Sequence, residues 1–272
     1  MQLVTSINDL YNMKQTALTL KQSELLEDLI VKHGQVVTSD QIFREAERYW
    51  DYKQAKNLVT KLVKNGWLIR VKRGLYAISD LGTRGFLSLS PYVVANLLVP
   101  ESYVSFELAL QNYGMFDQFT DKTISISLKT YKSVKLNSIE YSYIKTKQEY
   151  YFGWQDIQLD NQSARVATPE KALLDMINFH RSQYSIDLVI EKLTEHKEDL
   201  DFARLNDYLS KFSITTIKIF GLIYDLLGID SDELYELVKA KRSTNWMLPE
   251  DSKFNAKWRL YYNDYFDKYQ VV

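Results

Sequence analysis

Apolar positions recur with a helical period in the first third of the chain, and polar residues divide them into separate elements. The apolar side chains of residues 20–33 cluster as on one helix, which Gly34 would end. Thr38 and Ser39 are suited to an N-cap, and the pattern after them predicts a second helix over 40–47. Two helices joined by a short connection are therefore expected, preceded by an arm or short leading helix over 1–18.

A third predicted helix, over 52–65, has two chemically different faces. Asp51 supplies its N-cap and Gly66 its end. The apolar face consists of Ala55, Leu58, Val59, Leu62 and Val63. The opposite face is polar and consists of Lys53, Asn57, Thr60, Lys61 and Lys64. No acidic residue lies on the polar face, so the helix would present a positive surface.

A two-stranded hairpin is expected directly after this helix. Residues 67–72 alternate between apolar and polar side chains, Arg73-Gly74 supplies a turn, and 75–79 returns as the partner strand. Three helices followed by a hairpin are typical of a winged helix-turn-helix. The sequence therefore predicts an α+β protein that begins with such a module.

The pattern changes after residue 79, which indicates a second domain. Gly82, Gly85 and Pro91 separate the hairpin from the next predicted helix, and we place the domains at 1–84 and 85–272. The second is expected to contain a small sheet and a mostly helical C-terminal part. Its predicted strands are 123–128, 139–146, 155–159 and 164–166. Its predicted helices are 91–98, 105–113, one that begins at Thr168, 185–195, 202–211, 214–227, 231–241 and a final helix within 258–269.

Positive charge is concentrated in the predicted winged helix. Residues 44–73 contain nine Lys or Arg and three Asp or Glu. Residues 1–83 have a net charge of +3, and residues 84–272 have a net charge of −4. The net charge of −1 for the whole chain does not reveal this difference. Such asymmetry is expected for one nucleic-acid-binding module joined to a second domain.

Composition excludes several classes of protein. The chain has no cysteine, so disulfide frameworks, thiolate metal sites and thiol nucleophiles are excluded. The first residues lack the pattern of a secretory signal, and no apolar run approaches the roughly 20 residues that cross a bilayer. We expect a cytoplasmic protein without a membrane segment.

If the third helix enters the major groove of DNA, twelve residues become candidate contacts. Those that could reach base edges are Tyr52, Lys53, Gln54 and Asn57. Those nearer the phosphates are Arg44, Arg48, Lys56, Lys61 and Lys64. Those on the hairpin are Arg70, Lys72 and Arg73. The alternative is a solvated basic helix face without a ligand, but the agreement of pattern, hairpin and charge favours DNA.

No convincing active site or metal site is visible. His33, His180 and His196 show no ligand spacing. The acidic pairs Asp199/Asp201 and Asp230/Asp232 precede helices and are interpreted as caps. We therefore predict no catalytic residue, no metal and no cofactor.

Lysines and tyrosines alternate around the predicted strands of the second domain. They are Lys129, Tyr131, Lys132, Lys135, Tyr141, Tyr143, Lys145 and Lys147. Such a surface could contact RNA or a protein, but lysines that protect edge strands from aggregation are the favoured interpretation.

Three segments resemble the AbiEi antitoxin family of abortive-infection, type IV toxin–antitoxin operons. The hairpin Arg70-Val-Lys-Arg-Gly-Leu-Tyr76 is similar to that family's basic wing. Ser102 to Gly114 resembles its Tyr-Ile-Ser … Ala-Leu … His-Gly helix, with Tyr113 in place of the histidine. Ala167-Thr-Pro-Glu-Lys-Ala-Leu-Leu-Asp175 is similar to the helix start after its small sheet. Order and spacing fit over residues 34–180.

The resemblance implies a function for each domain. The N-terminal domain would repress its own operon by binding inverted repeats in double-stranded promoter DNA, with two copies on the DNA. The C-terminal domain would neutralise a nucleotidyltransferase-like toxin without forming a stable complex with it. On this interpretation the protein is not an enzyme.

Two other functions remain open from the sequence alone. The chain could be a nuclease or a nucleic-acid-modifying enzyme with a winged-helix targeting module, if Asp156, Asp160, Glu170 and Asp175 converged on one cavity. It could also be an adaptor whose basic helix binds an acidic protein.

Overall fold

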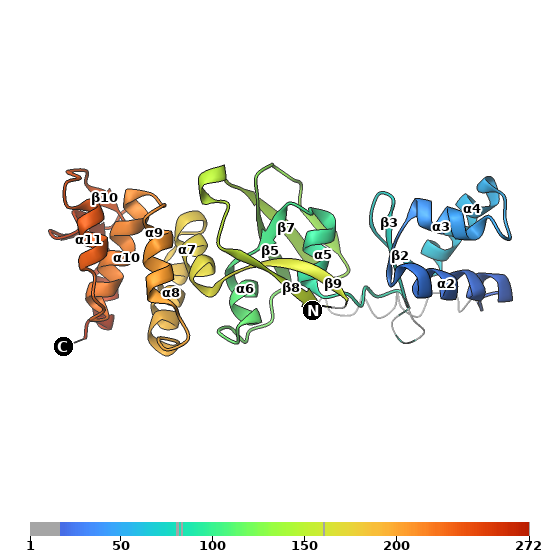
Figure 1. Ribbon diagram of the computed structural model, residues 1–272. Helices are drawn as coiled ribbons and strands as arrows, with labels where there is room; N and C mark the ends of the chain where they lie inside the picture. The colour runs from blue at the N-terminus through green and yellow to red at the C-terminus, as the bar shows by residue number, and fades with distance from the viewer. Residues whose placement is uncertain (1–16, 80–81, 83, 160, 272) are drawn as a thin grey trace. The chain divides into compact units, whose positions relative to one another are not determined.

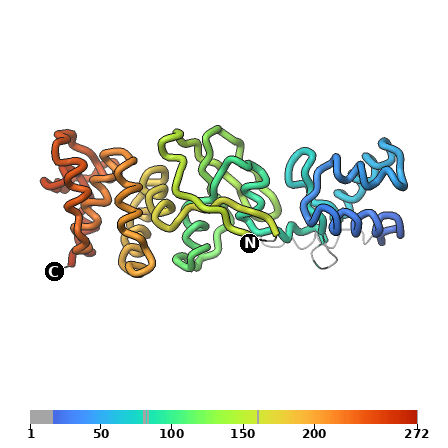
Figure 2. Tube along the Cα trace, viewed as in Figure 1, coloured from blue at the N-terminus to red at the C-terminus, as the bar shows by residue number. Residues whose placement is uncertain are grey.

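The chain forms two compact units. The computed structural model describes residues 17–79, 82, 84–159 and 161–271, so nearly all of the expected arm lies outside the described residues. One unit comprises residues 1–98 and 135–138, and the other comprises 99–134 and 139–272. Both can be followed along the chain in Figure 2. The functional boundary expected after residue 84 stays a prediction.

The first unit has the three helices and the hairpin expected from the sequence, together with one additional strand and one further helix (Figure 1). Its elements are α2 (Leu20–His33), β1 (Val36–Thr38), α3 (Ser39–Ala46), α4 (Tyr52–Lys64), β2 (Leu68–Lys72), β3 (Leu75–Ile78) and α5 (Pro91–Leu98). The unpredicted strand β1 pairs antiparallel with β3, and the sheet order is β1-β3-β2. A three-residue strand is too short to show an alternating pattern, which explains why the sequence did not reveal it.

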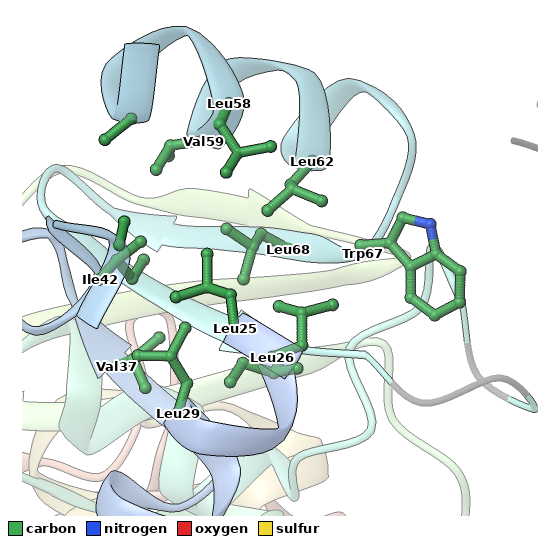
Figure 3. Close-up of a cluster of buried hydrophobic side chains, with 13 residues drawn as sticks. Leu25, Leu26, Leu29, Val37, Ile42, Leu58, Val59, Leu62, Trp67 and Leu68 are labelled. Atoms are coloured by element: carbon green, nitrogen blue, oxygen red, sulfur yellow. The ribbon is translucent and has the colours of Figure 1, made fainter. Parts of the chain in front are cut away.

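The first unit is held by one apolar cluster between its helices and sheet. In Figure 3, Leu58, Val59 and Leu62 of α4 point toward leucines of α2 and Leu68 of β2. The members from α2 and α3 are Leu25, Leu26, Leu29, Ile42 and Ala46. Burial of this face fixes which side of α4 is left toward solvent.

The second unit combines a mixed sheet with a stack of helices. Its strands are β4 (Ser102–Val104), β5 (Lys122–Ser127), β7 (Ile139–Lys145), β8 (Trp154–Leu159), β9 (Gln162–Ala167), β10 (Asn245–Trp246), β11 (Lys253–Asn255) and β12 (Leu260–Tyr262), while β6 (Val134–Leu136) is divided between the two units. Its α-helices are α6 (Phe106–Asn112), α7 (Pro169–Phe179), α8 (Gln183–Glu195), α9 (Phe202–Leu209), α10 (Ile214–Leu226) and α11 (Asp232–Val238). Two 3-10 helices, η1 (Gln148–Tyr150) and η2 (Asp264–Tyr269), complete it.

The larger sheet has the order β6-β7-β5-β4-β9-β8, and the boundary between the units crosses β6. β4 runs parallel to β9 and antiparallel to β5, while β5 runs parallel to β7. The predicted strands 155–159 and 164–166 are confirmed as parts of β8 and β9, which pair as an antiparallel hairpin, and Asn161 between them has a positive φ of 56°. Asparagine tolerates this turn conformation better than most residues.

The helix predicted from Thr168 is confirmed as α7, and it lies at the centre of the second unit. The Thr168 hydroxyl accepts a hydrogen bond from the backbone N–H of Lys171, and Pro169 occupies the first turn. Residues 169–177 are all buried. The polar side chains of a helix that is buried on every side need hydrogen-bond or charge partners within the protein. In α7 the carboxylates of Glu170 and Asp175 have such partners.

Asp175 is the acceptor in a buried polar network. It forms an ion pair with Lys171, and it accepts hydrogen bonds from Ser105 Oγ at 2.8 Å and Tyr103 Oη at 3.1 Å. Lys171 Nζ also donates to Tyr103 Oη at 2.9 Å. Burial raises the pKa of Asp175 and lowers that of Lys171, and each charge opposes this shift in its partner.

The helix predicted within 258–269 is correct only for the end of this segment. Residues 260–262 form β12, and the 3-10 helix η2 comes after it. β12 pairs with β10 and β11, which lie earlier in the sequence, so pairing at a distance overrides the local preference of this aromatic segment.

Within the described residues, no helix is both long and apolar enough to span a bilayer.

Candidate nucleic-acid interface

The start of α4 is fixed by a reciprocal cap. Asp51 Oδ1 accepts a hydrogen bond from the Gln54 backbone N–H at 2.8 Å, and Gln54 Oε1 accepts one from the Asp51 N–H at 3.2 Å. Gln54 was predicted to reach a base edge, but its amide oxygen is engaged in the cap. A contact of Gln54 with a base would use its amide nitrogen or the second lone pair of its amide oxygen.

We predict that Asp51→Ala lowers the free energy of unfolding of the first unit by about 1 kcal/mol, because one orphan N–H of α4 loses its acceptor. Thermal denaturation would measure this loss. Asp51→Asn keeps an acceptor oxygen and should retain most of the stability. Equal losses in both variants would contradict a capping role.

The polar face of α4 is exposed, as the amphipathic pattern predicted. Ala55, Leu58, Val59 and Leu62 are buried. The exposed members are Tyr52, Lys53, Gln54, Lys56, Asn57, Thr60, Lys61 and Lys64. Tyr52 is 67% exposed and its ring meets Phe43 edge to face, with 5.2 Å between ring centroids. The side chains with the greatest potential for base contacts therefore face solvent.

The remaining predicted contacts come from three other places in the first unit. Arg44 lies in the last turn of α3 and Arg48 in the connection to α4. Arg70 and Lys72 lie on β2, and Arg73 occupies the turn before β3. All are exposed except Lys72, which is half-buried and donates from Nζ to the backbone carbonyl of Leu98 at 3.3 Å.

Most cations of this set have no carboxylate partner among the described residues. The exception is Arg48, which pairs with Asp28 at 3.3 Å. Glu45, the acid next to Arg44, is engaged by other residues: Lys32 and His33 bind it and hold the pKa of its carboxyl below its usual value. The positive charge of α4 is therefore left for an external anion.

A contact that sequence reasoning missed positions the hairpin. The backbone N–H of Ser39, at the start of α3, donates to the carbonyl of Gly74 at 2.9 Å. Gly74 has φ +78°, a conformation that favours glycine, and a Cβ there would lie 3.6 Å from Ser39 Oγ. The contact joins residues far apart in sequence, so no local pattern could have indicated it.

The carboxylates considered for an active site are engaged in separate structural roles. Asp175 belongs to the buried network, and Glu170 accepts hydrogen bonds from the Asp201 N–H at 3.0 Å and from Arg204 at 3.4 Å. Asp156 is exposed and lies 3.8 Å from Arg165. Asp160 lies outside the described residues. In the part of the chain that is described, no group of three or more His, Asp or Glu side chains could hold a metal ion.

The capping role predicted for the two acidic pairs is confirmed for Asp201, whereas Asp230 stabilises a turn just before α11, whose N-cap is Ser231. Asp201 accepts from the Arg204 N–H at 2.9 Å at the start of α9. Asp230 accepts from the Asp232 N–H at 2.9 Å.

The surface of alternating lysines and tyrosines is only partly formed, since Tyr141 is buried and burial raises its pKa to about 12. Tyr131 binds Glu101, and Lys135 lies on the edge strand β6.

The exposed cationic helix, its cap and the following hairpin are features of a helix-turn-helix regulator. Residues 24–79 match the family model described as "Transcriptional regulator, AbiEi antitoxin". This match confirms the resemblance to the AbiEi antitoxin family, and it lies within the first unit. The family is one of regulators rather than enzymes.

The fold is similar to that of a solved structure over most of the chain. The solved structure is the crystal structure of the RV2827C protein from Mycobacterium tuberculosis, with a TM-score of 0.64 and 12% sequence identity. The similarity covers 90% of this chain and 92% of that chain. At this identity the likeness shows a shared fold alone. No curated protein matches the chain.

Proposed function

We propose that the first unit is a winged helix that binds double-stranded promoter DNA and represses the operon that encodes it. The observation that carries this proposal is the polar face of α4, which is exposed, contains no acid and has no ion pair among the described residues. An uncompensated row of lysines costs little in water but is strongly attracted to a polyanion.

The geometry of α4 suggests a division of labour among its residues. Tyr52, Lys53, Gln54 and Asn57 lie in its first two turns, the part of a recognition helix that usually reads bases. Lys56, Lys61 and Lys64, with Arg44 and Arg48, would bind phosphates. Arg70, Lys72 and Arg73 would let the hairpin follow the neighbouring groove or its backbone.

The second domain, over 85–272, would act as the antitoxin. On this proposal it counters a nucleotidyltransferase-like toxin encoded in the same operon, without a stable complex and without chemistry of its own. Support comes from the family match of the regulator segment and from the structural engagement of the candidate carboxylates. Binding to inverted repeats would place two copies of the chain on the DNA. The protein would act in the cytoplasm.

Replacing Lys53, Asn57, Lys61 and Arg73 together by alanine is expected to weaken binding to the operon's promoter at least tenfold at moderate salt. Three cations are lost, so the slope of log K against log salt should decrease by about two to three. Mobility-shift titrations over a salt series would measure both quantities. The same full-length variant should still rescue cells that express the cognate toxin, because its second domain is unchanged.

A control variant separates site-specific loss from a general loss of charge. Lys129, Lys132 and Lys197 are exposed in the second unit, and their replacement by alanine removes the same number of positive charges. Promoter binding should persist in this control. Unchanged promoter binding by the four-residue variant would refute the DNA-binding proposal, and loss of rescue would refute the division between domains.

A further inference from the structure

The small C-terminal sheet presents a row of aromatic rings on one face. Trp246 of β10 is opposite Tyr261 of β12, which is opposite Phe254 of β11. Trp246 and Tyr261 are stacked with 5.1 Å between centroids and 16° between planes. Tyr261 and Phe254 are 5.0 Å apart and tilted by 50°. We call Trp246, Tyr261 and Phe254 the aromatic row.

The aromatic row lies on the outer face of this sheet. Leu260 and Tyr262, which flank Tyr261 on β12 and so point to the other face, are buried. Trp246 is 50% exposed and Phe254 is 45% exposed. Exposed large aromatic side chains on neighbouring strands form an apolar patch, which is a common feature of binding surfaces.

Four exposed cations without carboxylate partners in the described chain either contact the strands of the row or precede them in the sequence. They are Arg181, Lys241, Arg242 and Arg259, which we call the cationic rim. Arg181 donates to the backbone carbonyl of Trp246 at 3.3 Å, so its guanidinium is held against β10. Arg259 Nε donates to the Arg242 carbonyl at 3.0 Å, which brings these two residues together where β10 and β12 begin. Other lysines of this region are paired, such as Lys257 with Asp225 at 2.8 Å.

We propose that the outer face of this sheet binds single-stranded nucleic acid, with bases stacking on the aromatic row and phosphates on the cationic rim. Unpaired bases can reach the rings, whereas the bases of a duplex are covered by their own stacking. The strand β10 of two residues and β11 of three are too short to add an extended peptide by backbone pairing. The combination of flat rings and unpaired cations therefore favours a polyanion that carries planar groups.

The test uses the full chain and 5′-fluorescein-labelled U12 and dT12 oligonucleotides. Fluorescence anisotropy is measured in the background of the four-residue variant of Lys53, Asn57, Lys61 and Arg73, so that binding by α4 does not contribute. In that background Trp246→Ala with Phe254→Ala should weaken binding by roughly 5- to 100-fold. Lys241→Gln with Arg242→Gln should weaken it and reduce its salt dependence.

Two controls distinguish stacking from a change in fold or charge. Phe119 is 85% exposed and is not part of the row, so Phe119→Ala should leave binding unchanged. Trp246→Phe keeps a ring and should restore most of the affinity, while quenching of tryptophan emission by U12 should decrease in this variant.

Four results would overturn the proposal. The first is that neither U12 nor dT12 binds at low salt, and the second is that the loss of the two aromatic side chains does not change binding. The third is that Phe119→Ala weakens binding as much as that loss does. The fourth is that replacing Trp246 and Phe254 abolishes self-association of the protein while oligonucleotide binding persists. The last would assign the row to a protein interface. Preference for U12 over dT12, or the reverse, would identify RNA or DNA as the source of the strand.

Discussion

Asp175→Asn is expected to lower the free energy of unfolding of the second unit by about 3–5 kcal/mol. The substitution leaves the ammonium group of Lys171 buried without a countercharge, and an unpaired buried charge is among the most destabilising changes in a protein. Aromatic rings surround this ammonium group, with the centroids of Phe212 and Phe152 at 5.2 and 5.3 Å from Nζ. The rings attract the cation, but they cannot replace a carboxylate. Equilibrium denaturation would measure the loss.

Removing both charges should restore much of that stability. In Lys171→Met with Asp175→Asn, neither member of the pair carries a buried charge, and the asparagine can still accept hydrogen bonds from Ser105 and Tyr103. The exposed pair Lys211–Asp207 has the same four-residue spacing at the end of α9 and is 2.8 Å apart, so Asp207→Asn is a matched control and should cost less than about 1 kcal/mol. Similar losses for Asp175→Asn and Asp207→Asn would show that burial does not set the energy of the inner pair.

Gly221→Ala is expected to destabilise the second unit by about 2 kcal/mol, although alanine is the better helix former by about 1 kcal/mol. A Cβ at this position of α10 would lie 2.2–2.4 Å from three atoms of the Trp258 ring. The indole cannot move easily, because it is buried and its Nε1 donates to Asp225 at 2.6 Å. Thermal denaturation would measure the effect, together with loss of the near-UV signal of the buried indole.

A compensating change can show that the steric clash is the cause. The three atoms that the new methyl group would meet belong to the six-membered ring of Trp258. Trp258→Phe shortens this side chain, so the double variant should lose less stability than the sum of the single variants. Additive losses, or a stabilised Gly221→Ala variant, would contradict this explanation.

The first unit shows how far local patterns can predict a candidate site. Asp51 and Gly66 were expected to limit the third helix, and α4 begins and ends beside them. The apolar positions of that helix predicted its buried face, and with it the exposure of the lysines. These features arise from capping and from a helical period, which depend only on residues a few positions apart.

Other features of the fold depend on residues far apart in the sequence. Strands β1, β4 and β6 have three residues each, and each is defined by its partner strand rather than by its own pattern. The C-terminal aromatic segment was predicted to be helical, but it pairs with strands near residues 245 and 253. Tyr141 was placed on a surface, although its position on β7 buries it.

The sequence by itself determined the helices and hairpin of the first unit, the concentration of positive charge there and the resemblance to a regulator family. The tertiary structure alone decided that Asp175 and Glu170 serve the interior of the second unit, and that three aromatic residues from separate strands form one row. The physical reason is range: caps, periodicity and charge composition are local properties of the chain. The partner of a buried carboxylate, or the neighbour of an aromatic ring, is selected only when distant segments pack together.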